Sequence, residues 1–304
     1  MQAEWDDADA PVLLGRGQLV VETSRYRVRG NVAVPLTIEG DDASVTAHPA
    51  RVTPAPGATA PTEGLLPLVY LAMFAGPSVA GILMTGLVDG KAGFHDLRSR
   101  LLKWRVDVRW YVVALLTAPL VVTAVLLPLS LSSAGFLPGV FASDDKVSLL
   151  VIGLAAGLMT GLCEELGWTG FVIPRLRLRY GVLTTGLIVG LLWGAWHFPL
   201  FSGGDLSGAL PPALFLPLQL FTFLPAYRVL MVWVYDRTSS LLVAMLMHAS
   251  LTASTLILQP LDVAGMRALT YDLILAAALW LLIAALATAN GRQLSRPPLR
   301  PRVA

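Results

Sequence analysis

Five residues in the apolar part of this sequence have side chains that could form a hydrolytic site. Glu164 and Glu165 are adjacent, and His197, His248 and Thr252 follow them, each in a long apolar run. A charge at mid-membrane costs about 3 kcal/mol on insertion scales, so ionisable residues in such runs indicate function. Two carboxyl groups and two imidazoles can exchange protons with a substrate or bind a metal ion.

The residue types favour two kinds of chemistry. Adjacent helical residues point about 100° apart, so Glu164 and Glu165 should have different roles. Without a metal, Glu164 would act as general base on a water molecule and His197 would share that proton. His248 and Thr252, one helical turn apart, would donate hydrogen bonds to the oxyanion of the tetrahedral intermediate. With a divalent metal such as zinc, Glu164, His197 and His248 would be the ligands.

Each of these residues also has a structural interpretation. The glutamate pair and His197 could lie at helix ends and face lipid headgroups. His248 and Thr252 could form a hydrogen bond that joins two helices. For Arg228, near the expected cytoplasmic end of its helix, the position favours snorkelling to the interface over an ion pair with Glu165.

Glycines recur every four residues just before Glu164 and just before His197. They are Gly153, Gly157 and Gly161 in the first run, and Gly186, Gly190 and Gly194 in the second. Small residues at this spacing let membrane helices approach closely, so we expect the two faces to bring Glu164 and His197 together. In upright helices the two residues would differ in depth by about 10 Å, so tilt or a broken helix must close the gap.

The composition of the whole chain requires a membrane. Of 304 residues, 55% are hydrophobic and 14% are charged, against about 25% charged residues in a soluble domain. These values exclude a water-soluble globule and a disordered chain, and the single Cys163 excludes a disulfide-built domain. The net charge of +2 gives no indication of a nucleic-acid partner. Long unbroken apolar runs predict an all-α, polytopic transmembrane bundle.

Seven apolar runs approach the roughly 20 residues that a membrane-spanning helix needs. The expected spans are 65–88, 110–131, 147–173, 182–198, 210–234, 240–258 and 268–289. Basic loops, such as 89–109, alternate with loops poor in lysine and arginine, which predicts a cytoplasmic C-terminus. The same topology places residues 1–64 outside without a recognisable export signal, a conflict that an additional first helix would resolve.

The charge pattern divides the chain into three parts. Residues 1–64 are acidic and include a Pro/Ala/Thr-rich stretch, which predicts a water-facing, partly disordered extension with a weak strand near residues 25–38. Residues 65–290 form the expected transmembrane domain. Residues 291–304 form a basic tail.

Three motifs in this order resemble the CPBP family of intramembrane endopeptidases, also called the Abi or CAAX protease family. They are Glu164-Glu165-Leu-Gly-Trp-Thr, Trp193-Gly-Ala-Trp-His197 and His248-Ala-Ser-Leu-Thr252. The family patterns are Glu-Glu-x-x-x-Arg, aromatic-x-x-x-His and His-x-x-x-Asn/Asp. The resemblance covers roughly residues 65–289 and implies a helical membrane fold, with eight spans in the full family fold.

The resemblance implies peptide-bond hydrolysis inside the membrane. By position, Glu164 with His197 would activate water, Glu165 would be the accessory acid, and His248 with Thr252 would bind the oxyanion. It also implies a glutamate mechanism that needs no metal cofactor, although the family was first described as metalloproteases.

Two positions depart from the family pattern. Thr169 stands where the first motif has arginine, so the glutamate pair lacks a fixed cationic partner within its motif. Thr252 stands where the third motif has Asn or Asp, and its hydroxyl can still donate one hydrogen bond.

We therefore expect a CAAX-type peptidase that cleaves a membrane-associated peptide or protein in a bacterial cell membrane, with lipids around it. A non-catalytic membrane protein that confers bacteriocin immunity or stabilises a partner is the alternative. A transporter with a Glu/His proton relay is a third interpretation.

Overall fold

The structure is a computed structural model that describes residues 13–22, 27–39, 44–47, 66–201, 217–218, 220–261, 263, 265–290 and 294. The chain divides into two compact units, Met1–Glu63 and Gly64–Ala304, and each is described by itself.

The first unit contains an antiparallel sheet of three strands in the order β1-β2-β3. The strands are β1 (Leu13–Glu22), β2 (Arg27–Glu39) and β3 (Ser44–Ala47). The strand expected near residues 25–38 is therefore confirmed as β2. The water-facing and partly disordered character of residues 1–64 stays a prediction.

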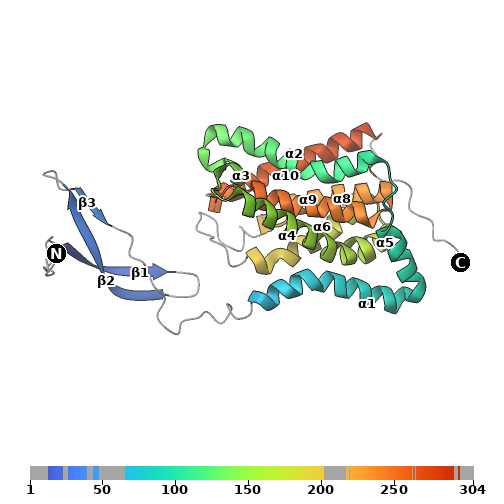
Figure 1. Ribbon diagram of the computed structural model, residues 1–304, viewed down its shortest axis with the longest axis horizontal. Coiled ribbons are helices and arrows are strands. Elements are labelled where there is room, and N and C mark those ends of the chain that lie inside the picture. The colour runs from blue at the N-terminus through green and yellow to red at the C-terminus, as the bar shows by residue number, and fades with distance from the viewer. Residues whose placement is uncertain are drawn as a thin grey trace. The chain divides into compact units, whose positions relative to one another are not determined.

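The described residues of the second unit form a helical bundle (Figure 1). Its long helices are α1 (Leu66–Leu101), α2 (Val108–Ser132), α4 (Lys146–Gly167), α6 (Val182–Phe201), α8 (Phe223–Thr238), α9 (Leu241–Leu258) and α10 (Gly265–Ala289). The short ones are η2 (Ala134–Phe136), α3 (Gly139–Ala142), the π-helix η3 (Trp168–Val172) and α5 (Ile173–Leu176). Among the described residues, five helices are long and apolar enough to cross a membrane. The prediction of an all-α polytopic membrane protein is confirmed.

Two of the expected boundaries differ from the structure. The span expected at 210–234 contains α8, which begins only at Phe223, and residues 202–216 lie outside the described residues. The loop expected at 89–109 is largely helical, because α1 continues to Leu101 beyond a kink at Gly90. Gly90 has a φ of 58°, which glycine adopts at little cost because it has no Cβ.

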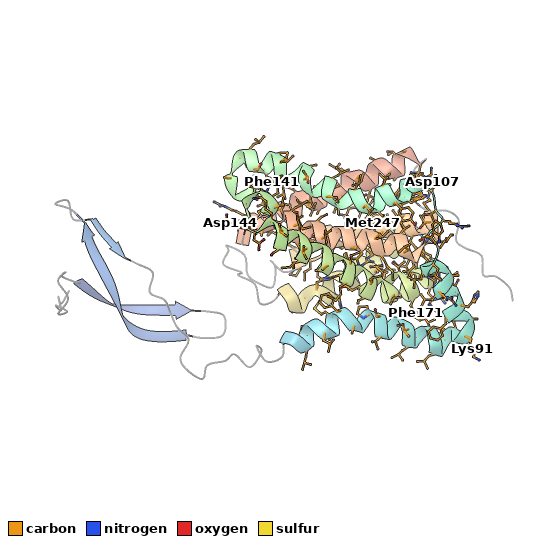
Figure 2. All side chains as sticks on the ribbon, viewed as in Figure 1. Lys91, Asp107, Phe141, Asp144, Phe171 and Met247 are labelled. Atoms are coloured by element: carbon orange, nitrogen blue, oxygen red, sulfur yellow. The ribbon has the colours of Figure 1, made fainter. Side chains whose placement is uncertain are left out.

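The first two charged loops lie at opposite ends of the bundle, as the predicted alternation of basic and non-basic loops requires. Figure 2 shows Lys91 and Asp107, from the basic segment after the first span, at one end of the bundle. Asp144, from the next connection, lies at the opposite end. Asp145 caps α4 there and accepts a hydrogen bond from the Ser148 backbone N–H at 3.0 Å. Hydrogen bonds from Ser148 lower the pKa of Asp145 from its ordinary value of 3.8.

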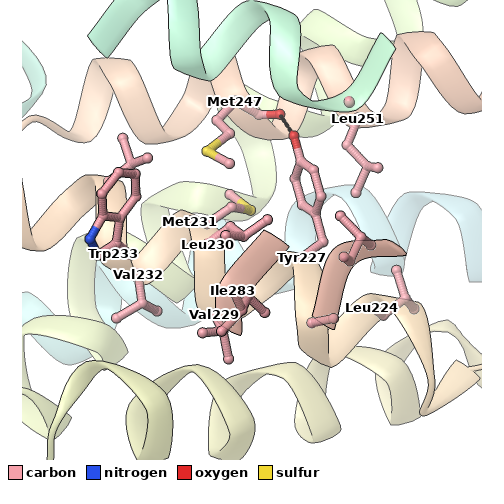
Figure 3. Packing of buried hydrophobic residues seen from close by; sticks show 14 of the residues in the cluster. Leu224, Tyr227, Val229, Leu230, Met231, Val232, Trp233, Met247, Leu251 and Ile283 are labelled. Atoms are coloured by element: carbon pink, nitrogen blue, oxygen red, sulfur yellow. Dashed lines mark hydrogen bonds between the residues drawn. The ribbon is translucent and has the colours of Figure 1, made fainter. Parts of the chain in front are cut away.

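Helix α8 is buried on nearly all sides. Figure 3 shows Leu224, Met231 and Leu251 in the hydrophobic cluster around it. The Tyr227 hydroxyl donates a hydrogen bond to the Met247 carbonyl at 3.0 Å, which joins α8 to α9 (Figure 3). Because protein surrounds α8, polar residues on it face other helices and not lipid.

The glycine face of α4 packs against α9. A Cβ added at Gly157 would lie 2.5 Å from the Ala249 carbonyl oxygen, a distance that real Cβ atoms do not reach. The absence of side chains therefore lets the two backbones touch. This contact brings α9, which carries His248, against the helix that carries the glutamate pair.

The glycine face of α6 packs against α8. A Cβ added at Gly190 would lie 2.5 Å from Cα of Pro225, and one at Gly186 would lie 2.5 Å from Cα of Val229. The two glycine faces allow close packing, as predicted. The expectation that these two faces themselves join Glu164 to His197 is wrong, because each face packs against a different helix.

Candidate active site

Glu165 is completely buried and accepts hydrogen bonds from three side chains. Its Oε1 lies 2.7 Å from Arg228 Nη1 and 2.7 Å from His248 Nδ1. Its Oε2 accepts a hydrogen bond from the Thr169 hydroxyl. A buried charge needs such compensation, since desolvation costs several kcal/mol per ion. Glu165 therefore links α4, η3, α8 and α9.

Glu164 is also buried, but its surroundings differ. Its Oε2 accepts a hydrogen bond from Trp193 Nε1 at 2.8 Å. Among the described residues, no second hydrogen bond reaches this carboxyl group. The two acids therefore have different surroundings, as their angular separation on the helix predicts. One oxygen of Glu164 keeps its lone pairs for another partner, whereas both oxygens of Glu165 are occupied.

Trp193 lies at the centre of the site and is 1% exposed. Its ring makes edge contacts with His197 and His248, with centroid separations of 5.3 Å and 5.0 Å. Cζ of Arg228 lies 4.1 Å from its ring centroid. Trp193 is part of the second sequence motif, but the motif alone assigns it no role. The signal for its role is the indole N–H, which needs a hydrogen-bond acceptor when the ring is buried.

His197 is held by its own helix. Its Nδ1 lies 2.7 Å from the Trp193 carbonyl oxygen one turn earlier. A carbonyl can only accept, so Nδ1 carries the proton and, in the neutral ring, Nε2 carries the lone pair. His197 can therefore accept a proton at Nε2.

The structure groups four of the five predicted site residues around Trp193. Glu164, His197 and His248 contact Trp193, and Glu165 contacts His248. Thr252 lies one turn after His248 on α9 and is half-buried. In the described part of the chain, no hydrogen bond joins Thr252 to the other four. Its place in the oxyanion site stays a prediction.

The interpretation of Arg228 as a snorkelling residue is wrong. Its side chain is 0% exposed and forms an ion pair with Glu165. Snorkelling requires a helix that faces lipid, and α8 is surrounded by other helices. The alternative considered from the sequence, an ion pair between Arg228 and Glu165, is confirmed.

Arg100 is a residue that sequence reasoning missed, because its charge was assigned to topology. Its Nη2 donates to the Gly170 carbonyl at 2.9 Å, and its Nη1 lies 3.0 Å from the Tyr235 hydroxyl. The π-helix η3 begins three residues after Glu165, and such turns are frequent at functional sites. Arg100 therefore ties α1 and α8 to the turn that carries Thr169.

Both chemistries predicted from the sequence, with and without a metal ion, stay predictions. Among the described residues, no three His, Cys, Asp or Glu side chains are grouped so that they could hold a metal ion. Glu164 instead accepts a hydrogen bond from Trp193, and Nδ1 of His248 contacts Glu165.

A cavity of about 300 Å³ lies between α1, η3 and α6. Trp168, on the turn after the glutamate pair, and Trp196, next to His197, both line it. Its other lining residues are apolar: Gly76, Pro77, Ala80, Gly81, Met84, Gly167, Phe171 and Val172. The cavity has room for an apolar group beside the candidate site.

These observations define a multi-pass α-helical membrane protein with two buried glutamates, a buried histidine and a half-buried histidine at one site. Residues 146–254 match the family model described as type II CAAX prenyl endopeptidase, Rce1-like. These residues include the whole candidate site, so this part of the chain is similar to the CAAX prenyl endopeptidase family. The resemblance found from the three motifs is confirmed over this range.

A curated relative shows the same likeness. Over 144 residues, the chain is 27% identical to the CAAX prenyl protease 2 of Methanococcus maripaludis. The alignment covers 45% of this chain and 52% of that relative. The chain thus spans about half the length of the curated relative that it matches.

Proposed function

We propose that this protein is an intramembrane endopeptidase in which Glu164 activates the attacking water. The observation that carries the proposal is the difference between the two buried acids. Glu165 has both oxygens occupied by three donors, whereas Glu164 accepts one hydrogen bond among the described residues. A general base needs an oxygen that can take a proton.

The reaction follows from these contacts. Glu164 takes a proton from water, and the resulting hydroxide forms a bond to the carbonyl carbon of the scissile peptide. When the tetrahedral intermediate collapses, the C–N bond breaks and the proton passes to the leaving amine. Nε2 of His197 shares this proton, because the hydrogen bond from Nδ1 to Trp193 leaves the lone pair on Nε2.

His248 and Thr252 would stabilise the oxyanion of the intermediate. The contact of Nδ1 with Glu165 orients the His248 ring, so Nε2 lies at the opposite edge. A proton on Nε2 would donate to the developing negative charge, as would the Thr252 hydroxyl. Glu165 acts through His248 and is the accessory acid of the site.

The substrate that we propose is a membrane-associated peptide or protein with an apolar group near the scissile bond. The apolar cavity between α1, η3 and α6 supports this choice, and the name of the relative indicates cleavage of prenylated proteins. We place the protein in a bacterial cell membrane with its basic C-terminal tail in the cytoplasm, where the positive-inside rule favours it. Membrane lipids would surround the apolar helices.

A non-catalytic role in immunity or partner stabilisation is the second candidate. The observation that favours it is Thr252, which offers a single hydroxyl where the family motif has an amide or a carboxyl group. This role predicts that loss of His197 leaves cellular function intact.

The test is cleavage of a lipid-anchored fluorogenic peptide by the purified protein in detergent. We expect His197→Ala to lower kcat about 100-fold or more, while His95→Ala, an exposed histidine on α1, cleaves as the wild type does. A metal chelator should leave the wild-type rate unchanged. Wild-type cleavage by a folded His197→Ala protein would contradict the proposal, as would loss of wild-type activity with the chelator.

A further inference from the structure

We propose that Arg228 is a positioning residue for the glutamate pair. It supplies from α8 the cation that the family motif carries at position 169, where this chain has Thr169. The inference deepens the proposed function and rests on it for its catalytic part. The contact that suggests it is the 2.7 Å ion pair between Arg228 Nη1 and Glu165 Oε1.

Thr169 and Arg228 each bind one oxygen of the Glu165 carboxylate. The Thr169 side chain is completely buried, and its uncharged hydroxyl donates a hydrogen bond to Oε2 of Glu165. The positive charge reaches the other oxygen from α8. A threonine is much shorter than an arginine, so its presence at position 169 leaves room for a guanidinium from a neighbouring helix.

Glu165 in turn stabilises the buried positive charge of Arg228. Its Nε and Nη2 have no hydrogen-bond partner among the described residues. Glu165 and the face of Trp193 are therefore the groups that compensate this buried charge, through an ion pair and a cation–π contact. A buried ion that loses its partner is strongly destabilising, so the stabilities of Arg228 and Glu165 variants should be coupled.

Arg228 also contacts the group that holds Glu164. Trp193, whose ring lies 4.1 Å from Cζ of Arg228, donates the indole hydrogen bond to Glu164. The close approach of Gly190 to Pro225 fixes α6 against α8 at this level. Removal of the guanidinium would therefore loosen both acids, although Arg228 contacts none of the reacting atoms.

The first experiment measures cleavage of the lipid-anchored peptide. We expect Arg228→Met, which keeps most of the volume, to lower kcat about 10- to 100-fold with little change in KM. Arg228→Lys should retain most of the activity, and Arg98→Met, an exposed residue on α1, should match the wild type. The double variant Thr169→Arg/Arg228→Ala should cleave faster than Arg228→Ala. Equal rates for Arg228→Met and the wild type would overturn the proposal.

A second experiment does not depend on proteolysis. Thermal unfolding of Arg228→Met, Glu165→Gln and the double variant forms a double-mutant cycle. We expect the double variant to be more stable than the sum of the single losses predicts. Additive losses would overturn the proposal even if the protein is a peptidase. Coupled losses in a protein that cleaves no peptide would support the positioning of Glu165 and contradict only the proposed function.

Discussion

The indole N–H of Trp193 donates a hydrogen bond to Oε2 of Glu164 across 2.8 Å, and this bond joins α6 to α4. Trp193 precedes His197 by one turn, which is about 6 Å along a helix. Trp193 therefore connects Glu164 to His197, although the sequence predicts that the two residues differ in depth. His197 thus lies one turn from the residue that donates a hydrogen bond to Glu164.

Replacement of Trp193 by Phe tests this bridge. The ring keeps its contacts with the two histidines, but Glu164 loses its donor. A hydrogen bond to a charged group contributes about 1.5–3 kcal/mol, so we expect kcat to fall about 10- to 100-fold with little change in KM. Peptide cleavage measures the effect. Trp280→Phe on α10, away from the site, is the matched control, and equal rates in both variants would refute the bridge.

Glu165→Gln should lower the stability of the folded protein. The amide leaves the buried Arg228 without its anion, and removal of one partner from such a pair costs about 3–5 kcal/mol. Asp96→Asn is the control, because the Asp96 side chain in its pair with Arg100 is 65% exposed and such pairs contribute about 0–1 kcal/mol. Thermal unfolding in detergent compares the two. Equal shifts of Tm would show that Glu165 is not the buried counterion.

Gly157→Ala should separate α4 from α9. The added methyl group would meet the Ala249 carbonyl, and overpacking of this kind costs about 1–3 kcal/mol. Gly135→Ala is the matched substitution, since a Cβ there would have its nearest neighbour at 3.5 Å. The Tm values of the two proteins are the measurement. A Tm drop for Gly135→Ala as large as that for Gly157→Ala would contradict the packing described here.

Ala80→Phe should narrow the cavity between α1, η3 and α6. We expect KM for a substrate with a long hydrocarbon group to rise severalfold, while kcat stays near the wild-type value. Val79→Phe, on the exposed neighbouring position of α1, should change neither. A KM increase that is the same for substrates with and without the hydrocarbon group would show that the cavity does not bind it.

The fold class and the acids and histidines could be predicted because membranes make charge expensive. Glu165 and His248 stand out in apolar runs for that reason, and the structure places them 2.7 Å apart. Five of the seven expected spans also followed from hydropathy, and the exceptions are the shorter helices α6 and α8. Helix α8 is short and enclosed by protein, so hydropathy does not locate its first residue.

The partners of the site residues could not be predicted, because they depend on which helices touch. The glycine faces of α4 and α6 indicate close packing but not the helix that each face meets. Arg228 appears as an interfacial residue from its position in the sequence, and its burial follows from the enclosure of α8. In the sequence, Thr169 indicates that the glutamate pair lacks a cationic partner. In the structure, Arg228 on α8 is a cation that contacts Glu165.

The most direct test of the proposed mechanism is the single-turnover cleavage rate of Glu164→Gln in lipid vesicles. The glutamine keeps an oxygen that can accept the Trp193 hydrogen bond, so Tm should change little, but it cannot take a proton from water. We predict a rate about 1000-fold or more below that of the wild type. A folded Glu164→Gln protein that cleaves within about tenfold of the wild-type rate would contradict the assignment of Glu164 as the general base.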